Sequence, residues 1–267
     1  MGGLWQAVCQ LWYADCSPSG LMPTNGRLRI AAVGDLHYVK GSQAALNTWL
    51  PRVAEHADVL VLCGDLTDYG RVDEAQELGR ELTSTLRLPI IAVLGNHDFE
   101  GGHPDAISDV LGTSGIHVLD GGSFEVHGVG FAGIKGFAGG FGRGALGPWG
   151  EPIIKQFVQE AIAEALKLET ALARLRTPHR IAVLHYSPIA GTVEGEPLEI
   201  YPYLGCSRLA EPLVRYPVTA VFHGHAHNGA PEGRHGDTPI YNVALPLMMR
   251  LSPELPFQVL TLDLATG

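Results

Sequence analysis

Cysteine is scarce in this sequence. Only four cysteines occur among its 267 residues, and no two of them form a CxxC pair. Their number and spacing disfavour a disulfide scaffold and a cysteine-based structural zinc site. Reduced thiols are the simplest interpretation, and they indicate a cytoplasmic protein.

Long apolar runs are also missing. The stretch LWQAVCQLWYA (residues 4–14) is interrupted by glutamine and lacks a basic flank. It is too short to span a bilayer and a poor match to a signal peptide, so we expect no membrane partner. Residues 1–27 are expected to form an N-terminal extension, unless translation begins at Met22. Residues 28–267 are expected to form one domain.

Positive charge is in short supply too. Lysine and arginine number 18 against 28 aspartates and glutamates, which gives a formal net charge of −10. This balance disfavours a protein that coats nucleic acid, and nucleic acid is not an expected partner. A positively charged pocket is still compatible with it, because bound metal ions do not enter that sum. The sequence gives no indication of the oligomeric state.

The first half of the chain alternates between predicted strands and helices. Apolar runs at 28–33, 58–63 and 89–94 each end in glycine and polar residues, and helical periodicity occupies 42–57 and 72–86. This alternation predicts an α/β fold with a mostly parallel sheet. Ligand sites in such sheets lie beyond the carboxyl ends of the strands, where the polar residues fall.

The second half is predicted to begin with antiparallel strands at 116–122 and 123–136. A glycine-dense stretch follows at 133–151 and then a long helix at 151–176. The glycine-dense stretch lacks the GK[ST] of a P-loop and is expected to border the site, with Lys135 or Arg143 as candidate substrate contacts. The remaining predicted strands are 179–185, 218–223, 238–243 and 257–264.

Five strand ends carry Asp, Asn and His. These ends are GDLH (34–37), GDLTD (64–68), GNHD (95–98), LHYSP (184–188) and HGHAH (223–227). Carboxylate and imidazole ligands together suit divalent ions such as Mn, Fe, Co and Zn. Four of the predicted ligands follow a glycine, which we expect to permit a tight turn into a shared pocket. Those four are Asp35, Asp65, Asn96 and His225.

In this order, Asp-x-His, Gly-Asp-x-x-Asp, Gly-Asn-His-Asp, a lone His and Gly-His-x-His resemble the motifs of the calcineurin-like metallophosphoesterase superfamily. GDLTDYG with GNHD is most similar to its bacterial phosphodiesterase branch. The resemblance spans most of the chain, from Asp35 to His227. It implies a four-layer α/β/β/α sandwich with two mixed sheets and a dinuclear metal site between them.

The resemblance also implies a role for each motif residue. The implied metal ligands are Asp35, His37 and His227 for one ion, Asn96, His185 and His225 for the other, and Asp65 as the bridge. His97 would face the substrate phosphate as general acid, and Asp98 would accept the other N–H of its ring. A hydroxide held by two divalent ions would then attack phosphorus. Asp68 and His223 are expected to support the ligands rather than bind metal.

The substrate is expected to be a small molecule with a phosphodiester. Protein Ser/Thr phosphatases of this superfamily carry Arg and Glu at the places where this chain has Tyr69 and Asp98, which disfavours that class. The alternatives are a phosphomonoesterase and a non-catalytic metal-binding scaffold, although such scaffolds tend to lose ligands. A metallo-β-lactamase type is disfavoured, because its His-x-His-x-Asp-His cluster does not occur here.

Overall fold

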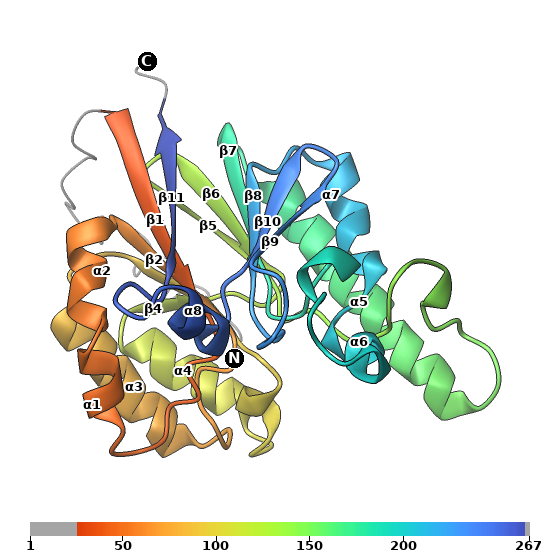
Figure 1. Cartoon of the computed structure of the whole chain (residues 1–267), viewed down its shortest axis with the longest axis horizontal. Helices are drawn as coiled ribbons and strands as arrows, with labels where there is room; N and C mark the ends of the chain where they lie inside the picture. Colours follow the sequence, from red (N-terminus) through yellow and green to blue (C-terminus); the bar gives the residue numbers. More distant parts are fainter. Residues whose placement is uncertain (1–25, 265–267) are drawn as a thin grey trace, which may run out of the picture.

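Two β-sheets pack face to face between two layers of helices (Figure 1). The computed structural model describes residues 26–264, so residues 1–25 of the predicted N-terminal extension, with the alternative start at Met22, lie outside the described residues, while Arg27 already belongs to the first strand. The layers follow the order expected of the four-layer α/β/β/α sandwich. Within residues 26–264, no helix combines the length and the apolar character needed to cross a membrane.

The first sheet is built from the first half of the chain plus one late strand. Its strands are β1 (Arg27–Val33), β2 (Val59–Cys63), β3 (Ile90–Val93), β4 (Ile116–Val118) and β11 (Gln258–Asp263), in the order β11-β1-β2-β3-β4. Strands β1 to β4 are parallel, and β11 pairs antiparallel with β1 at the edge. The helices of this half are α1 (Gln43–Asn47), α2 (Leu50–His56), α3 (Val72–Thr85) and α4 (Pro104–Thr113).

The prediction of one continuous helix over 42–57 is wrong. The segment forms α1 and α2, which are separated at Thr48 and Trp49. Pro51 lies in the first turn of α2, where its missing N–H costs nothing, whereas inside a longer helix it would remove a hydrogen bond. The apolar face was nevertheless predicted correctly, because Leu46, Trp49, Leu50 and Val53 are all buried.

The second sheet is also mixed. Its strands are β5 (Gly122–Val126), β6 (Val129–Gly133), β7 (His179–Val183), β8 (Ala220–His223), β10 (Thr238–Asn242) and β9 (Glu232–His235), in that spatial order. The antiparallel hairpin predicted near 123–136 is confirmed by β5 and β6. The antiparallel assignment of 116–122 is wrong, because β4 pairs parallel with β3 and closes the edge of the other sheet.

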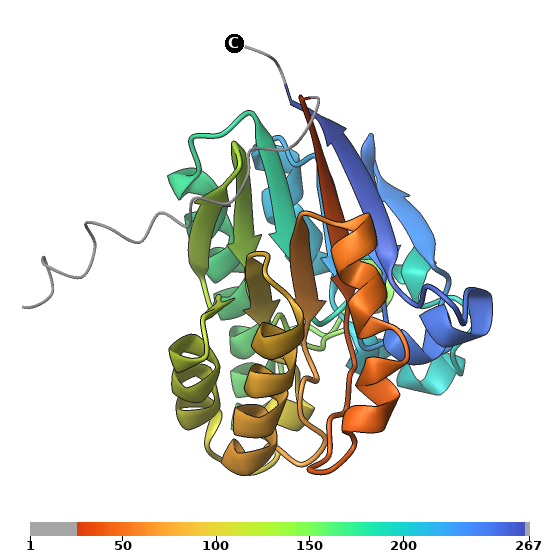
Figure 2. The same cartoon turned by 90° about the vertical axis from the view of Figure 1, so that its left-hand side faces the viewer.

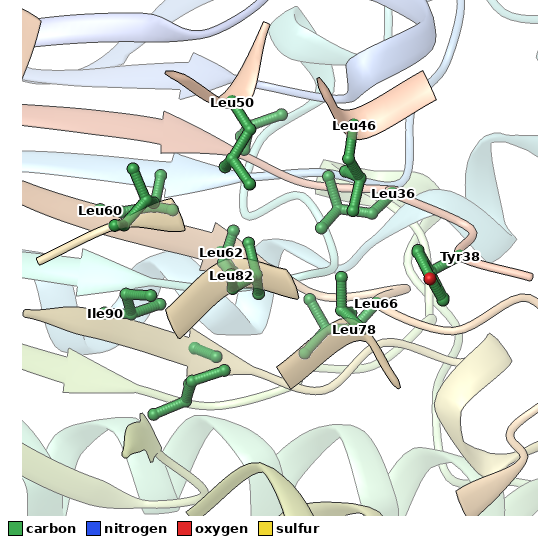
Figure 3. Packing of buried hydrophobic residues seen from close by; sticks show 14 of the residues in the cluster. Leu36, Tyr38, Leu46, Leu50, Leu60, Leu62, Leu66, Leu78, Leu82 and Ile90 are labelled. Carbon is green, nitrogen blue, oxygen red and sulfur yellow. The ribbon is translucent and has the colours of Figure 1, made fainter. Parts of the chain in front are cut away.

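The remaining helices belong to the second half of the chain. They are α5 (Pro152–Arg174), α6 (Tyr201–Leu204), α7 (Glu211–Arg215) and α8 (Leu245–Leu251). Helix α5 confirms the long helix predicted over 151–176. It places Ala161, Leu168 and Leu172 on the outer face of the second sheet. On the first sheet the equivalent layer joins Leu60 and Leu62 of β2 to the leucines of α3 (Figure 3).

A third core lies between the two sheets. It contains Ile30, Val61, Phe131 and Phe222 from the inner faces of both, all with no exposed surface. The strands of both sheets are therefore held in one stack, and the parallel ones run towards the same end of the molecule (Figure 2). The polar residues that follow these strands are brought together at that end.

Packing predicts unequal effects for two leucines of helix α5. Leu168 is fully buried in the core, whereas the side chain of Leu166, two residues earlier, is 55% exposed. Leu168→Ala should lower the free energy of unfolding by about 2–5 kcal/mol, because it leaves a cavity. Leu166→Ala should change it by less than about 1 kcal/mol. Urea titration monitored by circular dichroism measures both, and similar losses for the two variants would contradict the packing of α5.

Candidate metal centre

The polar residues that follow β1, β2, β3, β7 and β8 converge on one site. Three groups of side chains bring their ligand atoms within 4.8 Å of one another. The groups are Asp35, Asp65, His185 and His225; then Asp35, His37 and His227; then His37, Asp65 and His97. The amide of Asn96 joins them, because its Oδ1 lies 2.9 Å from Nε2 of His185.

The backbone at the predicted ligands is strained. Asp35, His37, Asp65 and His225 have φ angles of +56°, +43°, +48° and +70°. Non-glycine residues rarely adopt this left-handed conformation, at a cost of about 1–3 kcal/mol each, and they concentrate at functional sites. Hydrogen bonds hold the first two turns together, with Asp35 N donating to Gly64 O at 2.8 Å and His37 N to Asp65 O at 3.0 Å.

Two of the four glycines that precede predicted ligands, Gly95 and Gly224, make room for a carboxylate. They do not serve the tight turn that was expected of them. A Cβ atom on Gly95 would lie 2.2 Å from Oδ1 of Asp65, and one on Gly224 would lie 2.2 Å from Oδ2 of Asp35. Neither glycine has a positive φ. Any side chain at these positions would collide with a predicted ligand, so the missing Cβ makes room for the two carboxylates.

Backbone carbonyls fix the rings of the buried His185 and the half-buried His225. Nδ1 of His185 donates to Cys63 O at 3.0 Å, and Nε2 of His225 donates to Tyr203 O at 3.1 Å. Each bond places the proton on one nitrogen, so the other nitrogen presents its lone pair to the cluster. Burial lowers the pKa of His185, and it lowers that of His225 to about 3. Both rings are therefore neutral at physiological pH, as metal ligands must be.

Asp68 supports two further histidines. Its Oδ1 lies 3.0 Å from Nδ1 of His37, and its backbone oxygen accepts a 2.7 Å hydrogen bond from Nδ1 of His97. The Nε2 atom of His97 is left free, and the side chain is 38% exposed. His97 also donates its backbone N–H to Oδ1 of Asp65 at 2.8 Å. The prediction that Asp68 supports the ligands agrees with these contacts.

The predicted role of Asp98 in orienting His97 is wrong. Its buried carboxylate instead accepts hydrogen bonds from the backbone N–H groups of Leu66, Thr67 and Gly95, at 2.8–3.1 Å, and from the Thr67 hydroxyl at 2.7 Å. Burial raises the pKa of Asp98 despite these bonds. Asp98 thus links the GDLTD loop to the GNHD loop through hydrogen bonds. The ring of His97 is oriented by the backbone oxygen of Asp68 and not by Asp98.

The two central carboxylates differ in their electrostatics. Burial and the nearby charge of Asp35 raise the pKa of Asp65 to about 7. Burial also opposes ionisation of Asp35, but its 3.0 Å hydrogen bond with His227 and the surrounding imidazoles outweigh this and lower its pKa. The same contact raises the pKa of His227. Two carboxylates this close need positive charge to be ionised together.

The donor set fits divalent ions. It consists of carboxylate oxygens, one amide oxygen and imidazole nitrogens, without a thiolate, which is the ligand chemistry of Mn, Fe, Co and Zn. The second group brings together Asp35, His37 and His227, the set predicted for one ion. The first group joins the buried Asp65 to His185 and His225 of the other set. The roles of single residues as ligand, bridge or acid stay predictions.

Sequence reasoning missed the groups that act through the backbone. Cys63 and Tyr203 contribute only their carbonyl oxygens, and a carbonyl carries no sequence signal. His223, expected to be a packed or supporting residue, is fully buried, with Nε2 2.8 Å from the hydroxyl of Thr192. Thr67 could have been found, because it stands inside the GDLTD motif.

The model of the calcineurin-like phosphoesterase family matches residues 28–229. The chain belongs to this family. It is therefore a metal-dependent phosphoesterase of a family that uses two metal ions, and the recognition and the fold class expected from the motifs are confirmed. No curated protein matches the sequence.

Solved structures with the same fold share little sequence with the chain. The phosphopantetheinyl hydrolase of Mycobacterium tuberculosis is 15% identical with a TM-score of 0.63, and the match covers 88% of this chain and 96% of that one. The protein TT1561 of Thermus thermophilus is 15% identical with a TM-score of 0.53, over 89% and 99%. A putative 5'-nucleotidase of Staphylococcus aureus is 17% identical with a TM-score of 0.51, over 81% and 48%.

Metal binding should release protons near neutral pH. Because their pKa values are raised, Asp65 and His227 hold protons that a metal ion must displace. The affinity for Mn should therefore decrease as the pH is lowered from about 8 to about 6. Calorimetric titration of metal-stripped protein at about pH 7, in two buffers with different ionisation enthalpies, counts the protons released. The Asp65→Asn variant should release fewer protons than the wild type. Equal heats of metal binding to the wild type in both buffers would contradict the release of protons.

Proposed function

We propose that this metal-dependent phosphoesterase is a phosphodiesterase that acts on a small phosphodiester in the cytoplasm. The two divalent ions are drawn from Mn, Fe, Zn and Co. Phosphoester hydrolysis follows from the family, whereas the diester preference, the metals and the location are our proposal. The cytoplasmic location is supported by Cys63 and Cys206, which are both free and buried.

The diester preference is supported chiefly by Tyr69. Its side chain is 55% exposed directly after Asp68, at the place where the related protein phosphatases carry arginine. A phosphomonoester dianion carries one more negative charge than a diester, and Tyr69 brings no cation to balance it. The side chains of the three ligand groups add only carboxylates and imidazoles. No lysine or arginine belongs to these groups, so the metals would supply the positive charge at the scissile phosphate, which suits a singly charged diester better.

The chain's own residues have separate tasks in this reaction. Asp35, His37 and His227 would hold one ion, Asn96, His185 and His225 the other, with Asp65 between them. When bound, the ions supply Lewis-acid charge that activates water and neutralises phosphate oxygens. Asp65 also accepts the backbone N–H of His97, so the same carboxylate fixes the turn that carries the proposed acid.

His97 is proposed as the proton donor to the leaving group. Nδ1 donates to the backbone oxygen of Asp68 at 2.7 Å, so the proton to be transferred would be carried on Nε2 of the doubly protonated ring. The ring packs edge-on against His37 with 4.5 Å between ring centroids, which places it beside the cluster. Its partial exposure leaves a path for the departing alkoxide, and proton transfer from Nε2 would make that oxygen a better leaving group.

The alternative functions have less support. A non-catalytic scaffold would not need the complete set of seven predicted ligands. The fold alone does not distinguish a monoesterase from a diesterase, because similar structures include proteins named as a phosphopantetheinyl hydrolase and as a 5'-nucleotidase. A phosphomonoesterase is therefore the second candidate function. It differs from the proposed phosphodiesterase in the charge of the substrate that it prefers.

The first test compares two esters with the same leaving group. Mn-loaded protein should hydrolyse bis-p-nitrophenyl phosphate with a higher kcat/KM than p-nitrophenyl phosphate, because the diester carries less charge. Release of p-nitrophenolate measures both. A higher kcat/KM for the monoester would establish the phosphomonoesterase instead, and hydrolysis of neither by metal-loaded protein would support the scaffold.

A second test separates a proton donor from a metal ligand at His97. His97→Gln should keep both metals but lose about 10²–10⁴-fold in kcat on diesters with alkyl leaving groups. The loss on bis-p-nitrophenyl phosphate should be distinctly smaller, because p-nitrophenolate leaves without a proton. Metal content comes from elemental analysis, with His185→Gln as the control that loses metal. If His97→Gln also loses metal, His97 is a ligand, and equal losses on both esters would indicate phosphate positioning.

A further inference from the structure

Lys135 holds its ammonium group among aromatic rings beside the metal centre. Its Nζ lies 5.4 Å from the ring centroid of Phe99, 4.9 Å from that of Phe137 and 5.3 Å from that of Tyr186. Its backbone oxygen accepts the N–H groups of His185 and Tyr186 at 3.0 and 3.1 Å. The segment after β6 is thereby anchored to the segment after β7, which carries the predicted metal ligand His185.

The ammonium has unused hydrogen-bonding capacity. Nζ donates to Gly136 O at 2.7 Å, which occupies one of its three N–H groups. The neighbouring carboxylates of Asp120 and Glu164 are instead paired with Lys167, at 2.9 and 2.8 Å. No carboxylate within residues 26–264 forms an ion pair with Lys135. Burying a cation without an anionic partner is costly, and the aromatic rings offset only part of that cost.

A pocket opens next to this ammonium. Its volume is about 140 Å³, and Lys135 lines it together with Leu94, Phe99 and Leu119. Four carboxylates also line it: Asp120 and Glu164, which are paired with Lys167, and the exposed Asp105 and Glu160. Lys135 is the one lining cation without an ion-pair partner among residues 26–264, and its free donors beside apolar surface fit an anionic group.

Two aromatic rings link Lys135 to the metal centre. The Tyr186 ring contacts both Nζ of Lys135 and the ring of His225, whose centroid lies 4.5 Å away. Phe99, which also lines the pocket, stands two residues after His97 in the same turn (His97–Phe99). A substrate bound at the metal centre would extend past one of these rings to place a further group against Lys135.

We propose that Lys135 binds a second anionic group of the substrate, a non-scissile phosphate or a carboxylate a few bonds from the scissile phosphate. This rests on the proposed function, which places the scissile phosphate at the metal centre. The substrate class is then a phosphodiester that carries a further negative charge on one of its alcohol portions. Lys135 sets this specificity, and the pocket lined by Phe99 takes the portion that carries the charge.

Binding of matched diol phosphates tests this proposal without relying on turnover. The probes are the bisphosphates of ethanediol, propanediol and butanediol, each compared with the monophosphate of the same diol. Calorimetry on the Mn-loaded full chain should show that the second phosphate tightens binding by about 10-fold or more at one spacer length, as a charged hydrogen bond does. In Lys135→Met this gain should fall below about threefold.

Lys155→Met is the matched control, because it removes the same charge from an exposed lysine on α5 and should keep the gain. Lys135→Gln provides a second uncharged variant if Lys135→Met folds poorly, and it should lose the gain as well. A gain that survives in either Lys135 variant, or is missing from the wild type at every spacer length, overturns the proposal. Failure of the wild type to cleave bis-p-nitrophenyl phosphate would contradict only the proposed diesterase, since the calorimetry still decides on Lys135.

Discussion

The structure of this site depends on two buried carboxylates that face each other. Asp35 and Asp65 are each 1% exposed, and their oxygens lie within 4.8 Å of the same imidazoles. Neighbouring buried carboxylates ionise together only when positive charge lies nearby, and burial together with the charge of Asp35 raises the pKa of Asp65 to about 7. Two divalent ions would more than balance the pair and leave the site at about +2, which is what an incoming phosphate requires.

The surrounding backbone follows from this requirement. Bringing both carboxylates together forces Asp35 and Asp65 into left-handed conformations, and it leaves no room for a Cβ at Gly95 or Gly224. Strain of about 1–3 kcal/mol at each left-handed residue must be offset elsewhere. The core between the sheets supplies that stability, because it fixes β1 and β2, the strands that precede these two turns. Packing far from the chemistry therefore determines the geometry of the ligands.

Much of the fold and of the ligand set could be predicted because both are local in sequence. An apolar run that ends in Gly-Asp or Gly-Asn-His identifies a strand and its site residue together. The errors concern contacts made across the chain. Whether β4 joins β3 or β5 depends on register in three dimensions, and the partner of Asp98 depends on how two loops pack. The carbonyl of Tyr203 accepts a hydrogen bond from His225, which is 22 residues away in the sequence. The identity of neither side chain predicts this contact.

The correction at Asp98 changes how the proposed acid is held. Nδ1 of His97 donates to the backbone oxygen of Asp68 at 2.7 Å, and the carboxylate of the same residue lies 3.7 Å from that nitrogen, so Asp68 rather than Asp98 positions the ring. The negative charge of Asp98 is used instead by four donors that join the GDLTD and GNHD loops. Because Asp65 and His97 stand on these two joined loops, the bridging carboxylate and the acid keep a fixed separation. A proton donor held in this way suits in-line displacement, in which the attacking and leaving oxygens lie on opposite sides of phosphorus.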